Sequence, residues 1–187
     1  MEEYSYSDKS KKPKNAIAIN IVLTAIILIL LVLIILFSTI LTTMTVSGNS
    51  MCPTLNHGDR LIILKHGYKL ERGDIIVFKR ENAYNVKRIL GLEGDIIKFD
   101  LENMTWVVNG KAYEEKYVDD YSDNYFNMSD SDILKAIFSE KGLTVEQGKL
   151  FVLGDNRNIQ DNNGISVDSH IYGTLDITHV IGKVIKP

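Results

Sequence analysis

A short polar stretch, Ser47 to Leu55 with the sequence SGNSMCPTL, contains three side chains that could attack a carbonyl carbon: Ser47, Ser50 and Cys52. A serine hydroxyl is a poor nucleophile until a neighbouring base accepts its proton, so a reactive serine needs a partner supplied by the fold. A thiol is intrinsically the better nucleophile, but its activation needs a nearby positive group that lowers its pKa. We expect Cys52 to be a small, partly buried spectator.

The base for such a serine is not an obvious histidine, because none of the four histidines lies in a recognisable triad context. A lysine can take the proton if burial among apolar groups keeps it neutral near about pH 7 to 8. From a reference pKa of about 10.4, a drop of roughly 2 to 3 units costs the folded protein on the order of 3 to 4 kcal/mol. A catalytic lysine must therefore lie in a well-packed apolar site.

The segment YNVKRILGLEGD, which starts at Tyr84, offers such a lysine. In a strand, side chains alternate between the two faces, so Lys87 and Arg88 point to opposite sides and one of them points inward. The alternative for this segment taken by itself is an edge strand whose two basic side chains both reach solvent.

The elements that must position these residues are predicted to be strands. Short runs rich in Ile, Val and Phe recur beside Gly-Asp pairs, in GDRLIILK from Gly58, GDIIVFKR from Gly73, GDIIKFD from Gly94 and KLFVLGD from Lys149. This spacing indicates a mainly β fold, a compact antiparallel β domain. Asn109-Gly110 is the preferred two-residue turn of a hairpin between alternating strands.

An apolar run, Ala16 to Ile40, precedes this domain and contains no charged side chain. About 20 apolar residues cross a bilayer core, and a removable signal peptide has an apolar region of only about 7 to 15, so we expect a retained anchor. A buried core helix is the alternative. Lysines lie just before the run and the first basic residue after it is Arg60, which predicts a cytoplasmic tail (1–15), a transmembrane anchor (16–42) and an extracytoplasmic domain (43–187).

One acidic segment interrupts the β pattern, and we interpret it as an insertion at about 113–148. Between Tyr113 and Glu140 there are eight acidic residues and two lysines. We expect a solvated insertion on the β body, with an acidic docking surface as the alternative. Within it, SDSDILKAIFSEKG predicts a short helix with a Ser or Asp N-cap and Gly142 as terminator.

The composition points away from several classes of function. The formal net charge is −3, which gives no indication of a nucleic-acid partner. The single cysteine excludes an internal disulfide, and no zinc-ligand spacing is present. We expect neither a cofactor nor a metal.

Four motifs occur in a specific order behind the anchor: SMCPTL, GDIIVF, KRILGLEGD, and GDNR followed by SVDSH. In this order they resemble the motifs of bacterial type I signal peptidases, and more closely the Gram-positive branch, over nearly everything from the anchor to Pro187. The resemblance implies that Ser50 is the nucleophile and Lys87 its general base. The other matched positions would shape the nucleophile turn and substrate cleft (Met51, Pro53), orient the lysine (Ser166) and support the site (Asp155, Asp168).

The chain departs from the family pattern at three places. Some members carry a serine at the position of Gly48 to donate into the oxyanion hole, so here the oxyanion would depend chiefly on backbone N–H groups such as that of Ser50. Eight residues, Asn158 to Ile165, replace the usual two before Ser166, whose alignment then requires that this loop bulge outward. The common DSR reads DSH, so an ion pair of Asp168 would need a protonated His170 or a folded-back Arg157.

The resemblance implies a membrane-anchored serine endopeptidase that removes signal peptides from exported preproteins through an acyl-enzyme on Ser50. Its expected partners are preproteins and the phospholipid membrane, with the protein-export machinery as a further candidate, and its expected location is the cell membrane. Two alternatives remain: a Ser-Lys peptidase dedicated to one surface protein, and a membrane-tethered β module whose dyad has lapsed.

Overall fold

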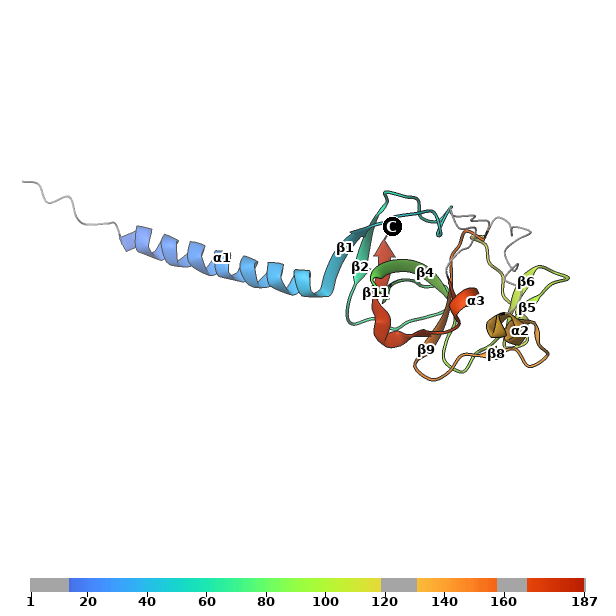
Figure 1. Ribbon diagram of the computed structural model, residues 1–187. Coiled ribbons are helices and arrows are strands. Elements are labelled where there is room, and N and C mark those ends of the chain that lie inside the picture. Colours follow the sequence, from blue (N-terminus) through green and yellow to red (C-terminus); the bar gives the residue numbers. More distant parts are fainter. Residues whose placement is uncertain (1–13, 119–130, 158–167, 187) are drawn as a thin grey trace, which may run out of the picture. The chain divides into compact units, whose positions relative to one another are not determined.

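The computed structural model describes residues 14–118, 131–157 and 168–186 (Figure 1). By its internal contacts the chain divides into two compact units, Met1–Ile40 and Leu41–Pro187. The first carries the predicted anchor and the second carries the motifs.

The first unit contains one helix, α1 (Lys14–Ile40), drawn in blue in Figure 1. At about 1.5 Å per residue, its 27 residues extend roughly 40 Å, enough to cross a bilayer core. Within residues 16–40, an 18-residue window has a mean hydropathy of 3.4 and none of it is buried, which excludes the core-helix alternative. The helix ends before the predicted anchor boundary at 42, because Leu41 and Thr42 already pair with a strand.

The second unit is built on a seven-stranded sheet in which all pairs of neighbouring strands are antiparallel. Its order is β1-β2-β11-β3-β4-β9-β10. The strands are β1 (Leu41–Thr45), β2 (Arg60–Leu64), β11 (Val180–Lys186), β3 (Ile75–Arg80), β4 (Ala83–Gly91), β9 (Lys149–Leu153) and β10 (Leu175–Asp176). The predicted antiparallel β fold is confirmed.

A second, four-stranded sheet follows the order β7-β6-β5-β8. Its strands are β5 (Ile96–Asp100), β6 (Thr105–Val108), β7 (Lys111–Ala112) and β8 (Leu143–Thr144). The predicted hairpin joins β6 to β7, and both turn residues have positive φ, 53° at Asn109 and 75° at Gly110. Asparagine and glycine tolerate this conformation, which matches the twist of the flanking strands.

The predicted helix in the acidic segment is present as α2 (Asp132–Phe138). Ser131 is its N-cap and accepts hydrogen bonds from the amides of Ile133 and Leu134, but the helix ends at Phe138, with Ser139 as C-cap, and does not continue to Gly142. Its side chains Leu134 and Ile137 are buried in a core cluster. The prediction of a solvated insertion is therefore wrong for α2, because its side chains Leu134 and Ile137 complete the core.

Three apolar clusters form the interior of the described part of the β domain. One packs α2 against β5, β6 and β9 around the fully buried Trp106. A second packs the β1–β2 loop, including Met51 and Leu55, on β2 and β3. A third lies between β3, β4 and β9 and includes Ile89. Two short helices, α3 (Ser169–Tyr172) and η1 (Ile177–His179), complete the described part of the chain.

Candidate active site

Ser50 lies in the loop between β1 and β2, which is closed at its base by two backbone hydrogen bonds. The amide of Val46 donates to the carbonyl of Asp59 (2.8 Å), and the amide of Gly58 donates to the carbonyl of Val46 (2.9 Å). Inside the loop, Met51 and Leu55 are 1% and 0% exposed and belong to the second cluster. These two apolar anchors hold the turn onto the sheet and leave Ser50 half-buried at its start.

Lys87 lies in the middle of β4, opposite Ile76 of β3, and its side chain is 3% exposed. Burial, which disfavours the charged ammonium, lowers the pKa of Lys87 below its ordinary value, although the carboxylates of Asp168 and Asp155 act to raise it. Arg157 lowers it further. The ammonium of this lysine therefore loses its proton more readily than that of a surface lysine.

The edge-strand alternative for this segment is wrong, because β4 lies between β3 and β9. Arg88, on the opposite face from Lys87, is also largely enclosed, with 14% of its side chain exposed. Both basic residues point inward because apolar clusters cover both faces of β4, with Val86 against the cluster of Met51 and Ile89 in the third cluster. Alternation alone predicted only one of them to do so.

Asp155 pairs with Arg88 through two hydrogen bonds, from Nε to Oδ1 (2.8 Å) and from a terminal guanidinium nitrogen to Oδ2 (2.5 Å). The side chain of Asp155 is fully buried. A bidentate arginine partner satisfies the charge of this carboxylate. Burial outweighs the attraction of Asp168 and Asp155 for the Lys87 ammonium, so the pKa of Lys87 is lowered.

Asp168 is also fully buried and is the N-cap of α3. Its carboxylate accepts hydrogen bonds from the amide of Gly154 (3.0 Å) and the amide of His170 (3.2 Å), and it contacts Nδ1 of His170. Burial alone would raise the pKa of Asp168, but His170, Lys87 and the Gly154 amide outweigh it and hold the pKa at about 2. His170 thus takes the place of the family's arginine beside Asp168.

Arg157 binds the GDNR turn and the acidic segment. Its Nε donates to the carbonyl of Gly154 (2.6 Å), and its guanidinium pairs with Glu115. Arg157 is 2% exposed. It stabilises the GDNR turn from inside the protein.

Asn156, which the sequence analysis did not single out, joins the GDNR turn to the nucleophile turn. Its amide donates to the carbonyl of Ser50, and its Nδ2 donates to the carbonyl of Asn49, both at 3.1 Å. A second link runs from Arg88 to the hydroxyl of Thr54 (3.4 Å). In the sequence, Asn156 could have been found only by its position between two motif residues, Asp155 and Arg157. Through these contacts the Ser50 turn, the Lys87 strand and both buried aspartates belong to one connected assembly.

The remaining predicted positions in the loop have clear local roles. Gly48 has a φ of +96°, a conformation that favours glycine, and its amide donates to Nδ1 of His57 (3.2 Å). Cys52 is half-buried, and its thiol donates a hydrogen bond to the carbonyl of Leu55 in the same turn (3.4 Å). Pro53 follows a cis peptide bond and is exposed. Ser166 and the loop before it lie outside the described residues.

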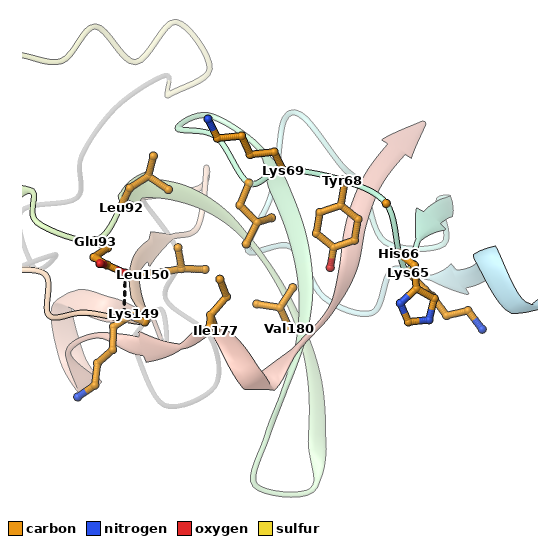
Figure 2. A pocket seen from close by; sticks show the side chains of 13 residues that line it. Lys65, His66, Tyr68, Lys69, Leu92, Glu93, Lys149, Leu150, Ile177 and Val180 are labelled. Atoms are coloured by element: carbon orange, nitrogen blue, oxygen red, sulfur yellow. Dashed lines mark hydrogen bonds between the residues drawn. The ribbon is translucent and has the colours of Figure 1, made fainter.

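The pocket shown in Figure 2 lies elsewhere, between the β2–β3 loop and the start of β9. Its volume is about 600 Å³, and it includes none of Ser50, Lys87, Asp155 and Asp168. The apolar side chains that point into the pocket include Tyr68, Leu92, Leu150, Ile177 and Val180. Lysines, among them Lys69, lie at its rim. The volume of this pocket therefore says nothing about the Ser-Lys site.

Comparison with known proteins identifies the family. The sequence pattern of the family described as "Signal peptidase, peptidase S26" matches residues 18–187. The chain belongs to this family. As a signal peptidase family member it is a peptidase of the signal peptidase I type, and the resemblance noted from its motifs is confirmed.

Two relatives within the signal peptidase family illustrate the match. The chain is 36% identical over 158 residues to Signal peptidase IB of Staphylococcus aureus, which covers 78% of this chain and 76% of that protein. It is 36% identical over 190 residues to Signal peptidase I P of Bacillus subtilis subsp. natto, with 96% and 95% covered. A crystal structure of a signal peptidase I from Enterococcus faecalis aligns with a TM-score of 0.44 and 28% identity, over 64% of this chain and 98% of that one.

Proposed function

We propose that the protein cleaves signal peptides from exported preproteins, with Ser50 as the nucleophile and Lys87 as its general base. One observation carries the assignment of the base: Lys87 is a buried lysine with a lowered pKa, on a strand tied to the Ser50 turn through Arg88, Asp155 and Asn156. A lysine of this kind can be neutral in the resting enzyme and accept a proton.

The proposed reaction proceeds through an acyl-enzyme. Neutral Lys87 Nζ takes the proton of Ser50 Oγ while Oγ bonds to the scissile carbonyl carbon. The tetrahedral intermediate then collapses, the C–N bond breaks, and the Lys87 ammonium returns the proton to the departing amine. In the second half Lys87 takes a proton from water, the hydroxide displaces Ser50 from the acyl carbon, and Ser50 recovers its hydroxyl proton.

The developing oxyanion needs donors that are already in place. Gly48 has no side chain to offer, so in this proposal the backbone N–H of Ser50 is the principal donor within the loop. Loss of a single donor in such a hole has cost about 100- to 1000-fold in a serine protease. The hydrogen bond from Asn156 Nδ2 to the carbonyl of Asn49 supports this role, because that carbonyl and the Ser50 N–H belong to the same peptide group.

The supporting residues would act through Lys87 and the turn. Asp155 holds Arg88, Asp168 is fixed by His170 and Gly154, and Arg157 braces the GDNR turn. Met51 anchors the nucleophile turn, and Pro53, which is exposed, is assigned to the substrate cleft. Ser166 is proposed to orient the Lys87 amine, as its match to the family motif implies.

The anchor places the enzyme with its substrate. The protein is membrane-anchored, and we propose that residues 1–15 face the cytoplasm and the β domain lies outside, as the lysines before α1 favour. A signal peptide inserted in the same bilayer would present its cleavage site at the outer face, and tethering both chains to one surface raises their effective concentration. The preferred substrates would carry small residues one and three positions before the cut, bound as an added strand. The export machinery is a further proposed partner, and nucleic acid is not.

The decisive experiment mixes the detergent-solubilised full chain with a preprotein and sequences the N-terminus of the product. We expect cleavage after the signal peptide by the wild type and none by Ser50→Ala or Lys87→Ala. Cys52→Ala is the matched control in the same turn and should cleave normally. Activity retained by either of the first two variants would refute the dyad, and a folded wild type inert on several preproteins would refute the function.

A further inference from the structure

Two arginines stabilise the GDNR turn, Gly154 to Arg157. Arg88 of β4 binds the Asp155 side chain, and Arg157, the last residue of the turn, binds the carbonyl of Gly154, the first. Within the turn, Asn156 donates hydrogen bonds from its backbone amide and from Nδ2 to the loop that carries Ser50. Together with the apolar anchors Met51 and Leu55, this turn therefore holds the Ser50 loop in place.

Both arginines are in turn held by residues of the acidic segment. The Glu115 carboxylate pairs with the guanidinium of Arg157, and it also accepts a hydrogen bond from the hydroxyl of Tyr117 (3.1 Å). The guanidinium of Arg88 lies over the ring of Tyr117, with its central carbon 4.0 Å from the ring centroid. Burial, followed by the Glu115 charge, raises the pKa of Tyr117, so its hydroxyl keeps its proton and donates. The result is a closed set of contacts around the GDNR turn.

The burial of Glu115 distinguishes it from the rest of its segment. Its side chain is 7% exposed, whereas that of the adjacent Glu114 is 79% exposed and pairs with the equally exposed Lys116. A carboxylate leaves water only where a partner compensates it, and here the partner is the buried Arg157. Glu115 is therefore directed at the site by the fold, and Glu114 is not.

We propose that Glu115 and Tyr117 are positioning residues of the peptidase reaction: by holding Arg157 and Arg88 they keep the GDNR turn, and with it the Ser50 loop, in register with Lys87. This inference rests on the proposed function, since it assigns supports to the same Ser-Lys site. It also gives the start of the acidic segment a role in catalysis that its exposed charges do not indicate.

The test compares Glu115→Gln with its exposed neighbour, Glu114→Gln, in full-length protein in detergent, using cleavage of a preprotein. A misplacement of the reacting groups by about 1 Å can cost about 100-fold, so we expect kcat to fall about 10- to 100-fold in Glu115→Gln, with KM changed less than about threefold. Glu114→Gln should match the wild type. Tyr117→Phe keeps the ring under Arg88 and loses only the hydroxyl, so its kcat should fall by less, about three- to tenfold.

The pH profile separates positioning from a general loss of structure. The charged groups that act on Lys87 are Asp168, Asp155 and Arg157. Removing the Glu115 charge leaves Arg157 less neutralised, and a stronger positive charge makes the Lys87 ammonium less stable. The acidic limb of the pH profile, where kcat/KM rises with pH as Lys87 loses its proton, should therefore move to lower pH in Glu115→Gln. It should stay in place in Tyr117→Phe and Glu114→Gln.

The outcomes distinguish this inference from the function on which it rests. Wild-type kcat in Glu115→Gln, or a loss of kcat with no movement of the limb, would overturn the positioning role. If Glu115→Gln does not fold, Tyr117→Phe decides: a lowered kcat supports the role and an unchanged kcat overturns it. If the wild type cleaves no preprotein, the proposed function itself fails. If the wild type cleaves, Ser50→Ala is inactive and Glu115→Gln is fully active, only the inference about Glu115 and Tyr117 is overturned.

Discussion

Asp168→Asn should remove a stabilising charge whose contribution depends on pH in a definite way. The pKa of Asp168 is about 2 in the folded chain, against 3.8 for an unperturbed aspartate. At about 1.4 kcal/mol per pKa unit, this difference corresponds to roughly 2 kcal/mol of stability. Because the folded-state pKa is depressed, the contribution is complete above the unfolded value of 3.8 and is lost as the pH falls toward about 2.

The assay is denaturant unfolding of the full chain in detergent at a series of pH values between about 7 and 2.5. Trp106, the single tryptophan and fully buried, reports unfolding of the β domain by its fluorescence. The wild type should exceed Asp168→Asn by roughly 2 kcal/mol near neutral pH plus a pH-independent offset from the altered hydrogen bonds. Roughly half of the pH-dependent part should be gone at about pH 3.

The exposed Asp132 provides the control, since Asp132→Asn should change the free energy of unfolding by no more than about 0.5 kcal/mol. A wild-type advantage over Asp168→Asn that stays flat from neutral pH to about pH 2.5 would refute the reasoning. It would mean that His170 and the Gly154 amide do not favour the ionised carboxylate over the protonated one.

Three further predictions concern the base, the buried ion pair and the sheet. Lys87→Met should lower cleavage by at least the factor of about 100 typical of a general base, and in the wild type kcat/KM should rise with pH through a value below the ordinary lysine pKa; cleavage by the variant at the wild-type rate would contradict this. Asp155→Asn leaves the Arg88 charge buried without its partner and should lower the free energy of unfolding by about 3 to 5 kcal/mol, measured by Trp106 fluorescence, whereas a change below about 1 kcal/mol would show that water compensates Arg88. Gly182→Ala places a Cβ 2.4 Å from the Leu64 carbonyl oxygen and should lower the melting temperature, with a loss of about 1 to 3 kcal/mol, unless β11 can move away from β2.

The strands were predictable because their signals are local. Gly-Asp pairs and runs of Ile, Val and Phe mark elements whose turn conformation and burial pattern depend on a few adjacent residues, and Asn109-Gly110 specifies its hairpin by backbone conformation alone. The acidic segment was misjudged for the opposite reason. Its charge count describes the segment as a whole and not its individual residues. Leu134 and Ile137 are buried in the core, and Glu115 pairs with Arg157, through contacts between distant parts of the chain.

The candidate site divides in the same way. Motif order alone was enough to propose Ser50 and Lys87, and alternation along β4 separated Lys87 from Arg88. Alternation could not predict that both side chains are enclosed, because that depends on what packs on each face of the strand. His170 beside Asp168 and Asn156 beside Ser50 are contacts between segments that only the folded sheet brings together.

The sequence by itself determined the anchor, the antiparallel β class, the family and the two residues proposed to react, since each of these depends on composition, local period or motif order. Only the tertiary structure decided how deeply Lys87 is buried, which partners hold Asp155 and Asp168, and that Glu115 and Tyr117 contact Arg157 and Arg88. The physical reason is that the pKa of a buried group depends on desolvation and on charges within a few ångströms. Such neighbours come from β4, the turn after β9, the start of α3 and the acidic segment, and no local pattern in the sequence specifies their meeting.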